Sequence, residues 1–136
     1  MHYSILVDNH DYRREYPILV GGVIAFPPKN YIQLNGYSNI YWGWGAEDDD
    51  MYFRMKRFDP FDRFHRPKKS VKYQMFNHKK RWKNPKRVQL LGKNRKIKSN
   101  LVDGLSNVNY TLVDVIKYET HTHLMIDVGE PPAELI

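Results

Sequence analysis

The sequence predicts a single domain of the mixed α/β (α+β) class, in which strands outnumber helices. Its 136 residues suit one domain with a modest hydrophobic core. Short apolar runs bounded by glycine and proline are typical of strands, whereas the segment after residue 47 carries apolar residues at helical spacing. No apolar run approaches the roughly 18 residues that a membrane-spanning helix needs.

The N-terminal part is expected to form two strands and a short helix. Residues 3–7 are predicted to be a short buried strand, and residues 17–26 a nearly continuous apolar strand. Gly21 and Gly22 interrupt the second run, which indicates a bend or a close approach to the backbone. The proline pair that follows is expected to start a short helix over residues 28–34.

The most unusual segment is 42–50, which reads Trp-Gly-Trp-Gly-Ala-Glu-Asp-Asp-Asp. Four consecutive acids repel one another, but the first turn of a helix favours negative charge because its N–H groups are free. We therefore predict an aromatic loop that runs into a helix ending near residue 57. The side chains expected to face the core are Met51, Tyr52, Met55 and Phe58.

The C-terminal part is predicted to end in an antiparallel strand pair, residues 110–118 and 123–128. Before it, short strands are expected at residues 63–65 and 71–76. Pro85 is then expected to open a weak helix. The apolar positions of this helix are Val88, Leu91 and Ile97.

Positive charge is concentrated in one segment of the chain. The net charge is +7, and residues 66–98 carry 14 of the 22 Lys and Arg residues and no acid. Such asymmetry predicts an anionic partner. On composition alone this segment could be a nucleic-acid-binding module with Tyr73, Phe76 and Trp82 as stacking platforms.

The absence of cysteine excludes disulfides, thiolate metal sites and cysteine nucleophiles. The first residues lack the basic region and long apolar run of a secretory signal, so no targeting signal is expected here.

Several motifs occur in the order in which one enzyme family carries them. Segment 42–50 closely resembles the signature of the β-1,4-galactosyltransferase family, and Gly21-Gly22-Val23, Met75-Phe76-Asn77-His78 and the final strand pair resemble further family motifs. The resemblance runs from about residue 2 to residue 129. It implies the C-terminal, acceptor-side part of a GT-A-type nucleotide-sugar transferase fold that lacks most of the Rossmann-like half, so we expect residues 1–136 to be one domain and a fragment of a longer catalytic domain.

The resemblance also implies an activity. The family consists of inverting enzymes that use a UDP-sugar and Mn²⁺ in the Golgi lumen and are held by a type II membrane anchor, which this chain lacks. The implied donor is UDP-galactose or UDP-GalNAc, the acceptor is a glycan that ends in GlcNAc, and no nucleic acid is expected as a partner. A catalytically incomplete remnant of the family is the alternative.

The resemblance assigns roles to the acidic segment and its surroundings. Asp48 is implied to be the catalytic base, Glu47 to hold the donor sugar and Asp49 to hold the acceptor, whereas Asp50 is interpreted as structural. Trp44 resembles the tryptophan of a loop that closes over the donor. The other donor-side residues implied are Gly45, as a hinge of that loop, and Gly22, where the backbone approaches the sugar.

Metal and acceptor residues follow from the same resemblance. Met75 and His78 are implied as manganese ligands, although a thioether is an unusual ligand for this hard cation. No Asp-x-Asp metal motif is identified, because the acids at residues 8–11 lie in the wrong place for it. Arg87 and Leu91 are implied to line the acceptor pocket.

Leu19 bears on the choice of donor. It occupies the position where galactose-specific members carry a tyrosine beside the C2 substituent of the sugar. A smaller aliphatic side chain leaves room for an N-acetyl group, so tolerance of UDP-GalNAc is expected beside UDP-galactose.

Overall fold

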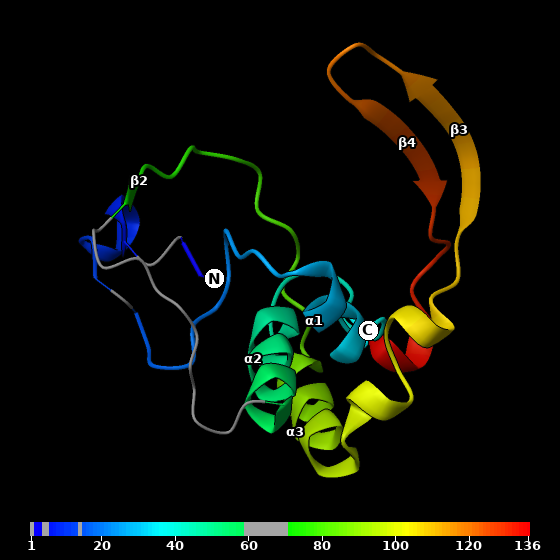
Figure 1. The fold of residues 1–136 in the computed structure, drawn as a ribbon. Coiled ribbons are helices and arrows are strands. Elements are labelled where there is room, and N and C mark those ends of the chain that lie inside the picture. Colours follow the sequence, from blue (N-terminus) through cyan, green and yellow to red (C-terminus); the bar gives the residue numbers. More distant parts are fainter. Residues whose placement is uncertain (1, 4–5, 14, 59–70) are drawn as a thin grey trace.

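A computed structural model describes residues 2–3, 6–13, 15–58 and 71–136 of the chain. Helices α1 (Pro28–Gln33), α2 (Glu47–Phe58) and α3 (Arg87–Ile97) form the body, and strands β3 (Thr111–Lys117) and β4 (Thr122–Asp127) form a hairpin that projects from it (Figure 1). Strands β1 (Leu6–Val7) and β2 (Lys72–Tyr73) pair in parallel. The mixed α/β class is therefore confirmed. No helix among the described residues is both long and apolar enough to span a membrane.

The core lies where α2 packs against the segment before α1. Its buried members are Val20, Leu34, Met51, Tyr52 and Met55. The prediction for Phe58 is wrong, since 52% of this residue is exposed. It is the last residue of α2, so its side chain lies beyond the core that the preceding turns cover.

Two of the expected strands are not formed as predicted. Among the described residues, the run 17–26 forms an isolated bridge between Ile24 and His2 and no named strand. Gly22, at a φ of +79°, breaks the extended backbone there, and of the apolar residues around it Val20 is buried in the core whereas Val23 is 46% exposed. Of the strand predicted at 71–76, only the two residues of β2 are in a strand. The strand predicted at 63–65 lies outside the described residues.

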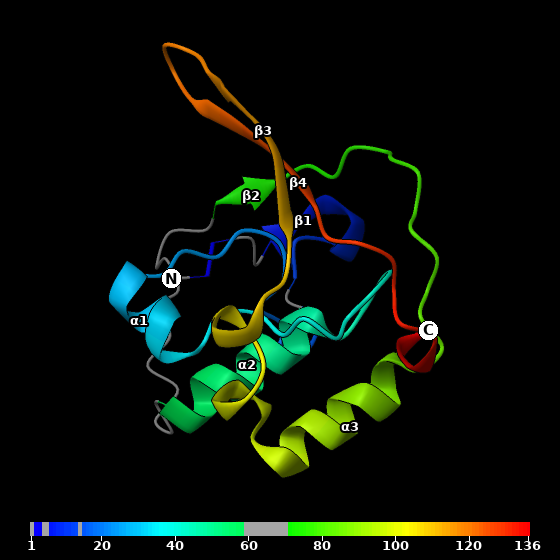
Figure 2. The same ribbon diagram turned by 90° about the vertical axis from the view of Figure 1, so that its right-hand side faces the viewer.

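Helix α3 is formed, but the apolar positions named from the sequence are not its buried ones. Val88 and Ile97 are exposed, whereas Leu90 and Asn94 are the buried positions. Figure 2 shows α3 running beside α2, and the Asn94 side-chain amide donates to Asp50 Oδ1 across this contact at 3.2 Å. A polar bond to the neighbouring helix therefore decides which face of α3 is buried.

A buried arginine joins α2 to the segment after α3. Arg54 is 1% exposed, and its Nε donates to Asp50 Oδ2 at 2.8 Å. Its Nη1 donates to the carbonyl oxygens of Gly36 and Asp103, and its Nη2 to the carboxylate of Asp103 at 3.3 Å. These bonds offset the cost of burying the guanidinium charge. Asp50 faces this network, which confirms its interpretation as a structural residue.

The β3–β4 pair confirms the antiparallel strands predicted at the C-terminus. Its register runs from Thr111 opposite Asp127 to Lys117 opposite Thr122, with an irregularity between Leu112 and Asp114. The chain then returns to the body, where residues 133–135 form a 3₁₀ turn against the start of α3 (Figure 2).

Candidate active site

A cavity of about 410 Å³ opens where the loop before α2, the start of α2, the start of α3 and the N-terminal segment meet. We call it the acidic cavity, because Glu47, Asp48 and Asp49 lie on its wall. All but one of the sequence-predicted site residues line it: Leu19, Gly22, Trp44, Gly45, Glu47, Asp48, Asp49, Met75, Arg87 and Leu91. Residues up to 72 positions apart in the sequence (19 to 91) are thus brought together.

The acidic cavity receives its carboxylates from the first turn of α2. Asp48 Oδ1 accepts a hydrogen bond from the backbone N–H of Asp49 at 3.0 Å, as expected where helix N–H groups are free. Asp48 Oδ2 lies against Gly21, where an added Cβ would be 2.5 Å from this oxygen. Gly21 is the glycine whose missing side chain makes room for the Asp48 carboxylate, whereas the approach of the Gly22 backbone to a donor sugar stays a prediction.

Asp49 places a buried carboxylate oxygen at the cavity wall. Its Oδ1 is buried and has no hydrogen-bond partner among the described residues. Burial, together with the neighbouring charge of Asp48, raises the pKa of the Asp49 carboxyl. Such an oxygen is ready to accept a hydrogen bond from a hydroxyl group that enters the cavity.

Tyr16 also lines the acidic cavity, and sequence analysis did not single it out. Burial, with the charges of Asp48 and Asp49, raises the pKa of the Tyr16 hydroxyl, which therefore stays protonated. The Tyr16 hydroxyl forms a hydrogen bond with the Asp49 side chain, and this bond lowers the pKa of Asp49, against the effect of burial. A tyrosine beside a proline in an otherwise apolar stretch gave no distinctive signal.

The Trp44 loop is tied to the basic segment that follows β2. The backbone N–H of Trp44 donates to the Trp82 carbonyl at 3.0 Å, and Trp44 pairs with Lys83 as an isolated parallel bridge. The indole is 55% exposed, with the Lys83 ammonium 5.1 Å from its ring centre. Gly45, at a φ of +112°, passes so close to Arg87 that an added Cβ would lie 2.6 Å from its Cδ.

Asn84 anchors this arrangement and was not identified from the sequence. It is 2% exposed, and its Nδ2 donates to the carbonyl oxygens of Trp42 at 3.0 Å and Leu135 at 2.7 Å. Its Oδ1 accepts from the Lys86 backbone N–H at 2.8 Å. One side chain therefore joins the tryptophan loop, the basic segment and the C-terminus. The Asn-Pro pair indicated a turn, but not these distant partners.

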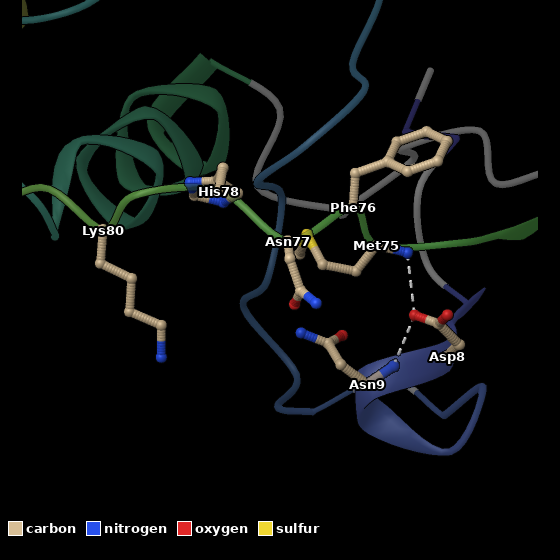
Figure 3. A pocket seen from close by; sticks show the side chains of 7 residues that line it. All are labelled: Asp8, Asn9, Met75, Phe76, Asn77, His78 and Lys80. Atoms are coloured by element: carbon tan, nitrogen blue, oxygen red, sulfur yellow. Dashed lines mark hydrogen bonds between the residues drawn. The ribbon is translucent and has the colours of Figure 1, made fainter.

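His78 is the predicted site residue that does not line the acidic cavity. It lies on an adjoining cavity of about 470 Å³ with Met75, which borders both cavities (Figure 3). Its Nδ1 is 3.2 Å from the Lys79 carbonyl, so a proton on Nδ1 leaves Nε2 as a ligand. Asp8 is also present, but its Oδ1 accepts the backbone N–H groups of Met75 and Asn9 at 2.9 and 2.7 Å.

The described residues contain no group of three His, Cys, Asp or Glu side chains that could hold a metal ion. The thioether of Met75 and the imidazole of His78 share one cavity wall but are only two donors, one of them soft. They fit part of a manganese site, and the described residues do not complete it.

Comparison with known proteins shows the family of the chain. The family model described as the N-terminal domain of galactosyltransferase matches residues 1–79. β-1,4-Galactosyltransferase 1 of Bos taurus is 33% identical over 134 residues, which cover 96% of this chain and 32% of the relative. The chain thus spans about a third of the length of the curated relatives it matches.

Solved structures show the same fold. The catalytic domain of Drosophila β-1,4-galactosyltransferase 7, crystallised with xylobiose, aligns with a TM-score of 0.66 and 26% identity over 86% of this chain and 52% of that one. A mutant of that enzyme in complex with manganese, UDP-Gal and xylobiose aligns with a TM-score of 0.50 and 23% identity over 84% and 51% of the two chains, and this likeness concerns the fold alone. With its family motifs gathered around one cavity, this chain belongs to the galactosyltransferase family.

Proposed function

We propose that the natural protein containing this chain is an inverting glycosyltransferase that moves galactose, or GalNAc, from a UDP-sugar to a GlcNAc-type acceptor in β-1,4 linkage. The observation that carries the proposal is the set of three acids, Glu47, Asp48 and Asp49, that line one cavity together with Leu19 and Arg87. Family membership supports the reaction class.

Asp48 is assigned as the general base. Its carboxylate accepts the proton of the acceptor hydroxyl while that oxygen forms a bond to the anomeric carbon of the donor sugar. The bond from this carbon to the diphosphate breaks at the same time, and UDP leaves with the bonding electron pair. Attack on the face opposite the leaving group inverts the anomeric configuration. The contact of Asp48 Oδ2 with Gly21 supports a fixed position for the base.

The flanking acids and the tryptophan loop are assigned to binding. Glu47 accepts hydrogen bonds from the donor sugar, and the buried Oδ1 of Asp49 accepts one from the acceptor. Arg87 and Leu91, from the start of α3, form the acceptor side of the cavity. Trp44 and the glycines beside it close over the donor and exclude water.

Manganese is proposed as the cofactor. Met75 and His78 would hold it together with oxygen ligands from outside the described residues, such as those of the donor diphosphate. When bound, the metal neutralises the charge of the departing diphosphate. The manganese and UDP-Gal bound by the Drosophila relative are in keeping with this assignment. A Golgi-luminal location with a type II membrane anchor is proposed from family membership.

The direct test is a transfer assay. The complete natural protein is incubated with UDP-Gal, Mn²⁺ and a β-linked GlcNAc acceptor, and product is measured with and without EDTA. A galactosylated product that EDTA abolishes is expected. Turnover no faster with Mn²⁺ than with EDTA would contradict the metal assignment, and the absence of any product would favour the alternative, a catalytically incomplete remnant.

Leu19→Tyr is expected to lower GalNAc transfer relative to galactose transfer. The larger side chain occupies the wall of the acidic cavity beside Gly21 and Gly22 and leaves less room for an N-acetyl group. We expect the ratio of the two kcat/KM values to change by about tenfold or more, in the range that a steric change in a pocket produces. An unchanged ratio would show that Leu19 does not lie beside the C2 substituent.

Gly21→Ala is expected to reduce kcat without unfolding the protein. The added Cβ would sit 2.5 Å from Asp48 Oδ2, so the carboxylate must move away from its position. Misplacing a catalytic group by about 1 Å typically costs about 10²-fold in rate. Gly92→Ala is the matched control, because an added Cβ there meets no atom within 4 Å. Equal kcat values for both variants would contradict the placement of Asp48.

A further inference from the structure

A run of cations follows His78 beside the acidic cavity, and the proposed reaction does not use most of them. Lys79 and Arg81 are exposed members of this run that line neither cavity. We call Lys79, Lys80, Arg81, Lys83 and Arg87 the basic rim. Lys83 and Arg87 line the acidic cavity itself, and Lys80 lines the adjoining one (Figure 3). The ion pairs seen among the described residues involve His10 and Arg54, so carboxylates of the described part of the chain do not neutralise the rim.

The rim has more positive charge than a nucleotide-sugar needs. A diphosphate carries about two negative charges, which the proposed Mn²⁺ would neutralise, and the five cations of the rim outnumber the four acids that line the acidic cavity. Lys86 is not counted, because its ammonium faces the carbonyl oxygens of Ala133 and Glu134. The surplus is therefore available to a second anionic ligand.

The charge pattern restricts what this ligand can be. The cavity wall carries Glu47, Asp48 and Asp49, which repel an anion and accept hydrogen bonds from hydroxyl groups. A ligand that reaches both regions must present a neutral, hydroxyl-bearing end to the acids and negative groups to the rim. A polynucleotide has a phosphate at every unit and fits this division poorly.

Exposed aromatic side chains lie along the same segment. Phe76 is 79% exposed, Trp82 48% and Trp44 55%. Trp44 lines the acidic cavity and Phe76 lines the adjoining one, so a ligand in either cavity would meet an exposed ring. The flat faces of such rings can stack against the apolar faces of sugar rings. The neighbouring cations can form charge-assisted hydrogen bonds with sulfate or carboxylate groups.

We propose that the acceptor is an anionic glycan. Its neutral terminal sugar lies over Asp49, and the sulfate or carboxylate groups of the following sugars contact the basic rim. The acceptor assignment rests on the proposed function, but binding to the rim can be measured without donor and without turnover.

The test compares two tetrasaccharides that end in GlcNAc, one sulfated and one neutral, by isothermal titration in about 0.1 M salt, where charge interactions reach about 10 Å. The sulfated glycan is expected to bind about tenfold more tightly or better, and the difference is expected to shrink as salt is raised. Equal affinities would overturn the proposal.

Two double variants separate a rim site from a general effect of net charge. Lys80→Gln/Lys83→Gln is expected to abolish the preference for the sulfated glycan. Lys93→Gln/Lys96→Gln removes the same amount of charge from exposed positions of α3. This variant is expected to retain the preference for the sulfated glycan. Equal losses in both variants would overturn the proposal, as would equally tight binding of a single-stranded RNA of the same charge. A retained preference in a protein without transfer activity would leave the rim site standing and reject the proposed function.

Discussion

Asp48→Asn is expected to lower kcat by about 10²–10⁴-fold, the range that general acid–base catalysis contributes. Asparagine has nearly the same shape but cannot take the proton from the acceptor hydroxyl. It can still accept the backbone N–H of Asp49, so the first turn of α2 should stay intact. The measurement is kcat for the complete natural protein, together with the dissociation constant of UDP-Gal.

The control for this prediction is Glu119→Gln, which removes an exposed acid from the turn between β3 and β4. It is expected to leave kcat and donor affinity unchanged. If Asp48→Asn retained wild-type kcat, the base assignment would be refuted. If it lost donor affinity as strongly as kcat, Asp48 would be a binding residue instead.

Arg54→Met is expected to destabilise the fold by about 3–5 kcal/mol, the usual cost of removing one partner of a buried ion pair. The change leaves Asp50 and Asp103 with uncompensated charge in the interior, and it removes donors from the carbonyl oxygens of Gly36 and Asp103. The measurement is the free energy of unfolding from urea titration.

Lys93→Met is the matched control for Arg54→Met, since it removes a cation from an exposed position of α3. It is expected to change the free energy of unfolding by less than about 0.5 kcal/mol. A similar small value for Arg54→Met would show that the buried network contributes little to stability.

The elements that sequence analysis predicted correctly depend on local signals. The acids at the start of α2 match the free N–H groups of a first helical turn, and Pro28 has the backbone geometry of a helix start. The antiparallel pair β3–β4 has a short connection and strands rich in β-branched residues. Such signals lie within a few residues of the element they predict.

The errors concern partners that lie far away in the sequence. The apolar run at 17–26 contributes Val20 to the core, but whether it joins a sheet depends on other strands, and among the described residues of the run Ile24 forms a bridge, with His2. The spacing of Asp50 and Arg54 is that of a helical ion pair. Its burial depends on Asp103, which is 49 residues from Arg54.

In the candidate site, too, the sequence indicated residues within motifs but not residues that act through distant partners. Family motifs indicated ten residues that line the acidic cavity, whereas Tyr16 and Asn84 were missed. Asn84 acts through the carbonyl oxygens of Trp42 and Leu135, and a backbone acceptor carries no sequence signature. The resemblance assigned a role to Gly22 alone, whereas the closeness of Gly21 to the Asp48 carboxylate is seen only in the structure.

The central claim is that Asp48 activates an acceptor hydroxyl for attack on the donor sugar from the face opposite UDP. The anomeric configuration of the product, determined by NMR after transfer from α-linked UDP-Gal, tests it most directly. Attack from that face predicts a β-linked product only. An α-linked product would show that configuration is retained and would contradict the assignment of Asp48 as the base of an inverting transfer.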